Sequence, residues 1–154
     1  MKQRFKEILF VIILFIVDII SKVLIENNLE LYESIDIIKG FFNITYVRNT
    51  GAAWSIMEGK MMFFYIITII GLVFMYYLYK NARDNNIEKY AVLMMVAGTL
   101  GNLFDRVLYQ YVRDFLDFII FGYDFPVFNF ADTFLCCGVF IYIIKVLYDE
   151  YNLK

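Results

Sequence analysis

Apolar residues gather into four long runs that polar connectors separate. Each run approaches or reaches the roughly 20 residues that an α-helix needs to cross the hydrocarbon core of a bilayer. The pattern therefore predicts four transmembrane helices, over approximately residues 8–25, 61–79, 90–108 and 127–148. The fourth run follows the only proline, Pro126, which suits the entry to a helix because a missing N–H costs nothing there.

The first run begins like a signal peptide, because Lys2, Arg4 and Lys6 form a positive segment before it. However, the run contains Asp18 and Lys22 and ends without the small residues of a cleavage site. We therefore expect a helix that is retained.

Lys and Arg are unevenly distributed among the connectors. They are dense in residues 1–7 and 80–89 and sparse in residues 26–60 and 110–126. Cytoplasmic loops carry an excess of these residues. Both termini and residues 80–89 are therefore predicted to be cytoplasmic, and the other two connectors to lie outside.

The first outer connector, residues 26–60, contains a candidate strand. Phe41–Val47 is rich in aromatic and β-branched residues and lies between Gly40 and Asn49–Gly51, which favour turns. Phe121–Phe128 could supply a second strand. We expect a small sheet on the membrane surface with Trp54 at headgroup depth, and the alternative is an unstructured aromatic-rich loop.

Composition supports the membrane interpretation. Hydrophobic residues make up 62% of the 154 residues, whereas soluble domains are usually about half apolar. The length suits one domain. The net charge of −2, without a basic cluster, gives no indication of a nucleic-acid partner. The adjacent Cys136 and Cys137 are interpreted as packing residues. The absence of histidine excludes His-dependent triads and His-ligated metal sites.

Two charged residues lie inside the first apolar run, where a charge costs about 2.5–3.5 kcal/mol at the bilayer centre. Asp18 and Lys22 are opposite in sign and one helical turn apart. They could form a structural ion pair that holds this helix to its neighbours, or they could belong to an active site.

The third run ends in a second group of polar residues. Gly98 and Gly101 would permit close helix packing. Asn102, Asp105 and Arg106 follow at the spacing that places side chains on one helical face. An amide, a carboxylate and a guanidinium on one face indicate a polar site near the outer end of this helix.

Three more polar residues complete the pattern. Asp114 follows the third run, and Asn129 and Asp132 share a face at the start of the fourth. Asp132 is expected about five residues into its helix, which is about 7 Å below the outer surface. The polar residues of the first, third and fourth helices are therefore predicted to meet in the outer third of the membrane.

Three functions fit such a cluster. If Asp114 and Asp132 face each other, burial and repulsion would let the pair share one proton, as in aspartic proteases. Carboxylates also bind Mg²⁺ or Mn²⁺ in lipid phosphotransferases, although Asp105 has the adjacent Arg106 to neutralise it. A channel or transporter would need a polar path, which the 61–79 run scarcely offers.

Five motifs stand in order along the chain: Asp18-Ile-Ile-Ser-Lys22, Asn49-Thr-Gly-Ala-Ala-Trp54, Gly101-Asn-Leu-Phe-Asp-Arg106, Val112-Arg-Asp-Phe115 and Phe128-Asn-Phe-Ala-Asp132. Each is short, but their order within four predicted spans is specific. Over nearly its whole length the chain resembles the lipoprotein signal peptidase (signal peptidase II) family of bacterial membrane aspartyl proteases.

The resemblance implies a single integral membrane peptidase domain over residues 1–154. Its fold would be an all-α bundle of four transmembrane helices with a small extramembrane β-sheet on the outer face. The family removes the signal peptide from diacylglyceryl-modified prolipoproteins, just before the lipidated cysteine, with water activated by an aspartate dyad.

The resemblance also assigns roles to residues. It places the catalytic pair on Asp114 and Asp132. Substrate binding or support of the dyad falls on Asn49, Gly51, Asn102, Arg106 and Asn129, and structural polar roles fall on Asp18, Lys22 and Asp105. No cofactor and no metal are implied.

The implied partners are lipid-modified prolipoproteins, membrane lipid and inhibitors of the globomycin type, with no nucleic acid and no second subunit. The implied location is the bacterial cytoplasmic (inner) membrane, with both termini cytoplasmic and the active site near the outer face.

One position departs from the usual family pattern. Arg113, directly before Asp114, is often a valine in the family. Its charge could favour the ionised form of Asp114, or the two neighbouring side chains could point apart and leave the carboxylate unaffected. Replacing Arg113 by valine is expected to shift the acidic limb of a pH–rate profile slightly, if at all.

Overall fold

Four long helices dominate the computed structural model, which describes residues 2–51, 57–82 and 86–152. Within these ranges the helices are α1 (Lys2–Asn28), α2 (Met61–Asn81), α3 (Asn86–Tyr109) and α4 (Phe130–Asn152). All four are long and apolar enough to cross a membrane. The prediction of a four-helix membrane bundle is therefore confirmed.

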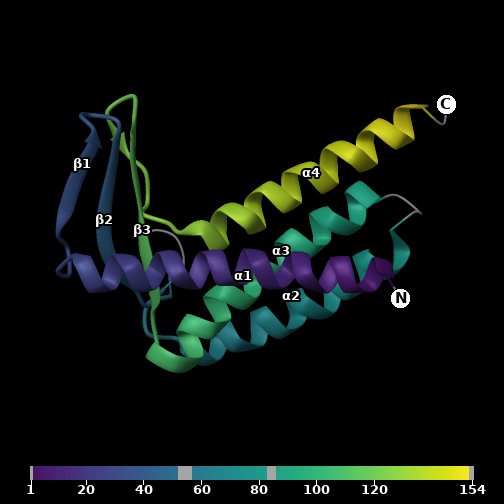
Figure 1. Ribbon diagram of the computed structural model, residues 1–154, viewed down its shortest axis with the longest axis horizontal. Helices are drawn as coiled ribbons and strands as arrows, with labels where there is room; N and C mark the ends of the chain where they lie inside the picture. Colours follow the sequence, from purple (N-terminus) through teal and green to yellow (C-terminus); the bar gives the residue numbers. More distant parts are fainter. Residues whose placement is uncertain (1, 52–56, 83–85, 153–154) are drawn as a thin grey trace.

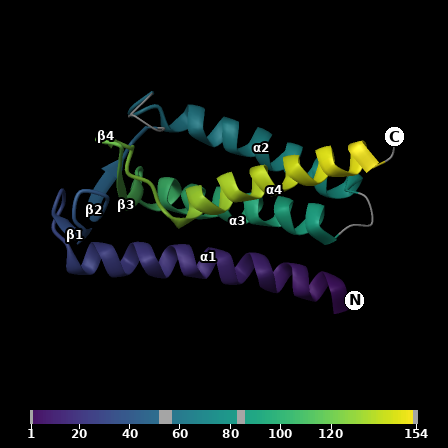
Figure 2. The ribbon, with the colours of Figure 1, turned by 90° about the horizontal axis from the view of Figure 1, so that it is seen from above.

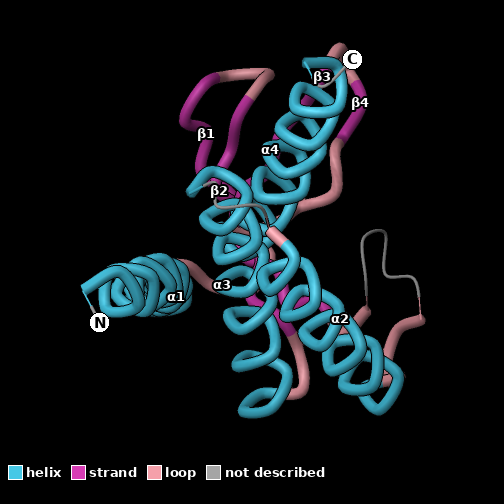
Figure 3. The backbone as a smooth tube through the Cα atoms, turned by 90° about the vertical axis from the view of Figure 1, so that its right-hand side faces the viewer, coloured by secondary structure: helices cyan, strands magenta, loops and turns pink. Residues whose placement is uncertain are grey.

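Helix α3 occupies the centre of the bundle and contacts each of the other three helices (Figure 3). Both termini lie at one end of the bundle, and the sheet lies at the other (Figures 1 and 2). The bundle is apolar outside and polar inside at the sheet end. Asp18 and Lys22 of α1 illustrate this inversion because both are buried, and Glu7 is buried nearer the opposite end of the helix. A lipid-facing exterior explains why large apolar side chains are exposed along the helices.

The sheet has the order β1-β2-β3-β4, and each neighbouring pair is antiparallel. Its strands are β1 (Ser34–Ile38), β2 (Phe42–Asn49), β3 (Val112–Ile120) and β4 (Tyr123–Asp124). The predicted 41–47 strand is found as β2. Strand β3 begins just after α3 and returns alongside β2, so a segment that looked like a connector passes directly over the ends of the helices (Figure 1).

Several local predictions need correction. The fourth helix begins at Phe130 and not at residue 127, because Phe128 instead forms an isolated bridge with Leu116 of β3. Pro126 thus precedes an extended segment. The predicted 121–128 strand is reduced to the two residues of β4 and this bridge. Trp54, expected at headgroup depth, lies outside the described residues.

Glycines set the distance between α3 and its neighbours. A Cβ at Gly98 would collide with the backbone carbonyl oxygen of Ala131, and one at Gly101 would collide with the carboxylate of Asp18. At Gly138 of α4, a Cβ would come within 2.6 Å of the carbonyl oxygen of Ala91. The expected close packing at Gly98 and Gly101 is confirmed, and it holds the start of α4 against α3.

Gly98→Ala is therefore expected to destabilise the protein by about 1–3 kcal/mol, because two backbones would have to separate. Gly71→Ala on α2 is the matched control, since a Cβ there meets nothing within 4 Å and alanine favours helix by about 1 kcal/mol. Thermal unfolding in detergent measures both. Equal melting temperatures for the two variants would contradict the packing assigned to Gly98.

Candidate active site

The amino-terminal end of α4 lies inside the protein, so its unpaired N–H groups need partners. Asn129 and Asp132 each accept a hydrogen bond from the backbone N–H of the other residue. The Asp132 N–H donates to Asn129 Oδ1 at 3.0 Å, and the Asn129 N–H donates to Asp132 Oδ2 at 3.2 Å. This is a capping box, with aspartate in the place of the usual glutamate. It makes Asp132 the third residue of α4 and fixes its carboxylate at the helix entrance.

Asp18 of α1 satisfies another of these groups. The Ala131 N–H donates to Asp18 Oδ1 at 2.8 Å, and Lys22 Nζ donates to Asp18 Oδ2 at 2.8 Å. Asp18 and Lys22 are fully buried. The predicted ion pair is therefore present, and through Asp18 it ties α1 to the start of α4.

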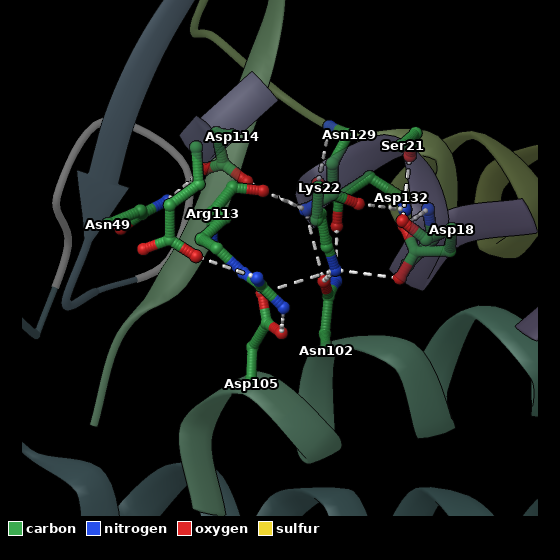
Figure 4. A network of polar contacts seen from close by, with 12 residues as sticks. Asp18, Ser21, Lys22, Asn49, Asn102, Asp105, Arg113, Asp114, Asn129 and Asp132 are labelled. Atoms are coloured by element: carbon green, nitrogen blue, oxygen red, sulfur yellow. Dashed lines mark hydrogen bonds and ion pairs between the residues drawn. The ribbon is translucent and has the colours of Figure 1, made fainter. Parts of the chain in front are cut away.

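Asp114 projects from β3 towards the same place (Figure 4). Asn49, the last residue of β2, donates from Nδ2 to Asp114 Oδ2 at 2.9 Å. Asn129 donates from Nδ2 to Asp114 Oδ1 at 2.6 Å. Each carboxylate oxygen thus accepts an amide N–H. Asp114 is only 2% exposed, whereas Asp132 is partly exposed, so the pair is open to its surroundings on the Asp132 side.

Asn102 of α3 completes the connection between these groups. It donates from Nδ2 to Asp132 Oδ1 at 2.7 Å. Its Oδ1 accepts from Asn129 Nδ2 at 3.0 Å and from Lys22 Nζ at 3.1 Å. The two asparagines and the lysine therefore join Asp114 and Asp132 in one hydrogen-bonded network (Figure 4).

The pKa of Asp114 is raised above the usual range of a carboxyl, mainly by burial and to a smaller extent by repulsion from Asp132. The N–H donors of Asn49 and Asn129 act in the opposite direction, because they favour the ionised form. Burial and repulsion together outweigh them. Asp114 therefore holds a proton more firmly than an ordinary aspartate does.

Asp105 has different partners from those expected. It forms ion pairs with Arg113 at 2.7 Å and with Lys22 at 3.5 Å, and not with the adjacent Arg106. Arg106 instead donates from Nη2 to the carbonyl oxygen of Gly51 at 3.2 Å and lies over the ring of Phe64, 4.6 Å from its centroid. Within the described part of the chain, Arg106 has no carboxylate partner, and its buried Nε has no hydrogen-bond acceptor.

The structure brings the predicted site residues together at the sheet end of the bundle: Asp18, Lys22, Asn49, Gly51, Asn102, Asp105, Arg106, Asp114, Asn129 and Asp132. The sequence interpretation missed Glu26, which binds Arg113 Nη1 at 2.9 Å. Its signal was the spacing of Asp18, Lys22 and Glu26, since residues four apart on a helix share a face. Across residues 2–51, 57–82 and 86–152, no three acidic or cysteine side chains come together as a metal site would require.

Comparisons with known proteins agree with the site. The family model for signal peptidase (SPase) II matches residues 10–148. A lipoprotein signal peptidase of Staphylococcus aureus (strain MRSA252) is 46% identical over 148 residues, which are 96% of this chain and 91% of that protein. The protein of strain JH9 is 45% identical over the same share of both chains.

Solved structures agree as well. A bacterial membrane enzyme solved by the in meso method at 2.3 Å resolution aligns with a TM-score of 0.90 and 45% identity. The alignment covers 97% of this chain and 92% of that one. A second structure, at 1.9 Å resolution, aligns with a TM-score of 0.84 over 92% of each chain.

Proposed function

Because the chain belongs to the signal peptidase II family and is a multi-pass bacterial membrane protease with lipoprotein signal peptidase function, we propose that Asp114 and Asp132 are its catalytic dyad. The bond cleaved lies just before the lipidated cysteine of a diacylglyceryl-modified prolipoprotein. One peptidase domain over residues 1–154 carries this activity.

One observation carries the proposal. Asn129 binds both aspartates, Asp114 through its side-chain Nδ2 and Asp132 through its backbone N–H. Asp114 comes from the sheet and Asp132 from a helix, so this juxtaposition requires the whole fold. Two carboxylates held together, one of them buried, are the arrangement that lets a pair share one proton.

The chemistry follows from that shared proton. The ionised carboxylate deprotonates a water molecule, which attacks the scissile carbonyl carbon, while the protonated carboxyl donates its proton to the carbonyl oxygen. The carbon–nitrogen bond then breaks as the leaving nitrogen takes one proton from the dyad, and a hydroxyl of the tetrahedral intermediate returns one proton to the dyad, which restores the shared proton. No covalent bond forms between enzyme and substrate. The raised pKa of Asp114 supports a pair that keeps one proton near neutral pH, and the titration belongs to the pair.

Substrate binding falls to the groups around the dyad. Arg106 is partly exposed, so its guanidinium can donate to a backbone carbonyl of the substrate. Gly51 lies beside it. Asn49 and Asn102 orient one aspartate each. The ion pair of Asp18 and Lys22, together with Asp105, serves as the scaffold beneath the site.

The reaction takes place at the outer face of the cytoplasmic membrane, with both termini in the cytoplasm. In support, the sheet and the dyad lie at the end of the bundle opposite the termini (Figure 1), and Lys and Arg are dense near the amino terminus. A lipid-modified cysteine is anchored in a leaflet, so its scissile bond is presented near the surface. The enzyme acts as a monomer, without a nucleic-acid partner.

The direct test is cleavage by the purified protein in liposomes. We expect a diacylglyceryl-modified prolipoprotein to be cut once, before the modified cysteine, with mass spectrometry locating the bond. The unmodified precursor serves as the control and should remain intact. Globomycin should inhibit, and EDTA should not, because the dyad needs no metal. Loss of activity in EDTA, restored by Mg²⁺ or Mn²⁺, would contradict the dyad mechanism.

A further inference from the structure

The side chain of Arg113 turns away from the dyad. Successive residues of a strand point to opposite faces, and Arg113 runs from β3 towards Asp105 of α3 while Asp114 faces Asn129 (Figure 4). Arg113 is 1% exposed. The second sequence-based alternative, that the two side chains point apart, is therefore the one observed.

Each nitrogen of Arg113 donates a hydrogen bond. Its backbone N–H and Nε donate to Asp105 Oδ2 at 3.0 and 3.2 Å, and its Nη2 donates to Asp105 Oδ1 at 2.7 Å. Nη1 donates to Glu26 Oε2 at 2.9 Å. The guanidinium also stacks on Tyr109, 4.6 Å from the ring centroid. Because Asp105 accepts two bonds from the guanidinium and Glu26 accepts a third, these contacts fix the orientation of the Arg113 side chain as well as its position.

These contacts connect three elements at one point. Asp105 belongs to α3, Glu26 to the outer part of α1, and Arg113 to β3. Removing the guanidinium would leave the buried Asp105 with the backbone N–H of residue 113 and, as its charged partner, Lys22 at 3.5 Å, and a buried charge that has lost its close partner is strongly unfavourable. These contacts therefore fix the position of β3 relative to α1 and α3 along the length of the bundle.

The contacts of Asp105 also extend to the start of α4, which carries Asp132. Lys22 contacts Asp105 and Asp18, and Asp18 accepts from the Ala131 N–H at the start of α4. Asp105 is therefore connected in one direction to Arg113, which precedes Asp114, and in the other direction, through Lys22 and Asp18, to Ala131, which precedes Asp132.

We infer that Arg113 is a positioning residue. Together with Glu26 and Asp105 it fixes the position of β3 relative to the helices, so that the carboxyl group of Asp114 lies close to that of Asp132. The inference rests on the proposed dyad. It also changes the expectation for Arg113→Val, because a displacement of about 1 Å at a catalytic group can lower the rate about 100-fold.

The test compares Arg113→Val, Arg113→Lys and Glu26→Gln in the liposome cleavage assay. Each kcat is normalised to the folded fraction, measured by gel filtration and thermal unfolding in detergent. We expect Arg113→Val to lower kcat about 10- to 100-fold with KM within about twofold. Lysine keeps the charge but lacks the planar fork, so Arg113→Lys should fall between wild type and Arg113→Val. Glu26→Gln should cause a smaller loss of kcat.

Two further variants sharpen the comparison. The double variant Arg113→Val/Glu26→Gln should be no slower than Arg113→Val, because residues that share one contact are not additive. Lys39→Val, a cation-to-valine change on an exposed turn of the sheet, is the matched control and should behave as wild type.

The outcomes separate the two proposals. Wild-type normalised kcat in Arg113→Val, or an effect on KM alone, would overturn the positioning role while leaving the dyad untouched. If Arg113→Val does not fold, wild-type kcat in both Arg113→Lys and Glu26→Gln would overturn it equally. Asp114→Asn is assayed alongside, and turnover by that variant would remove the dyad itself.

Discussion

Asp114→Asn and Asp132→Asn, made separately, should each lower kcat for prolipoprotein cleavage by about 10⁴-fold, the upper range for loss of a general acid or base. An amide can neither deprotonate water nor share the proton of its partner. Neither variant should lose its fold. Burial raises the pKa of Asp114, so the folded protein is penalised at neutral pH, where the carboxyl of the unfolded chain would be ionised, and an uncharged asparagine removes that cost. The liposome assay and thermal unfolding in detergent measure the two quantities.

Asp117→Asn is the matched control for these variants. Asp117 lies three residues further along β3 and accepts from Thr45 Oγ1, away from the dyad. It should retain wild-type kcat and a near wild-type melting temperature. If Asp114→Asn or Asp132→Asn turns over substrate at the wild-type rate, the dyad assignment is wrong, although the family membership would stand.

The helices, and the gathering of the polar residues towards one end of the bundle, could be predicted from the sequence because the bilayer imposes a fixed length on helices and a high cost on charge. Strand β3 could not be predicted in the same way. It carries Arg113, Asp114 and Asp117, so it lacks the clean alternation of a half-buried strand. Its charges are tolerated because each has a specific partner on another element, such as Asp105 of α3 for Arg113, Asn49 of β2 for Asp114 and Thr45 of β2 for Asp117.

Two local sequence signals gave different positions for the start of α4. Pro126 suggested an earlier helix entrance, but Asn129 and Asp132 already had the spacing of a capping box, which places the entrance between them. The pairing of Asp105 with Arg113 depends on the distance between a strand and a helix, and no local spacing encodes it. The sequence interpretation chose the adjacent Arg106, which the structure turns towards Gly51 and Phe64.

Asn129 should be the most sensitive of the supporting residues, because it performs two tasks at once. Its Oδ1 caps α4 by accepting from the Asp132 N–H, and its Nδ2 donates to Asp114. Asn129→Ala removes both. We expect a loss of stability of about 1 kcal/mol from the missing cap and a fall in kcat of about 100-fold from the displaced dyad, measured by thermal unfolding and the liposome assay.

Asn129→Ser separates the two tasks. Serine is a good helix cap, so its hydroxyl oxygen can accept from the Asp132 N–H and most of the stability should return. The side chain is too short to reach Asp114 as the amide does, so kcat should remain close to that of Asn129→Ala. Recovery of stability without recovery of kcat would identify the bond to Asp114 as the part that catalysis needs. Recovery of both would mean that Asn129 serves the site only by capping α4, and that Asn49 alone suffices to orient Asp114.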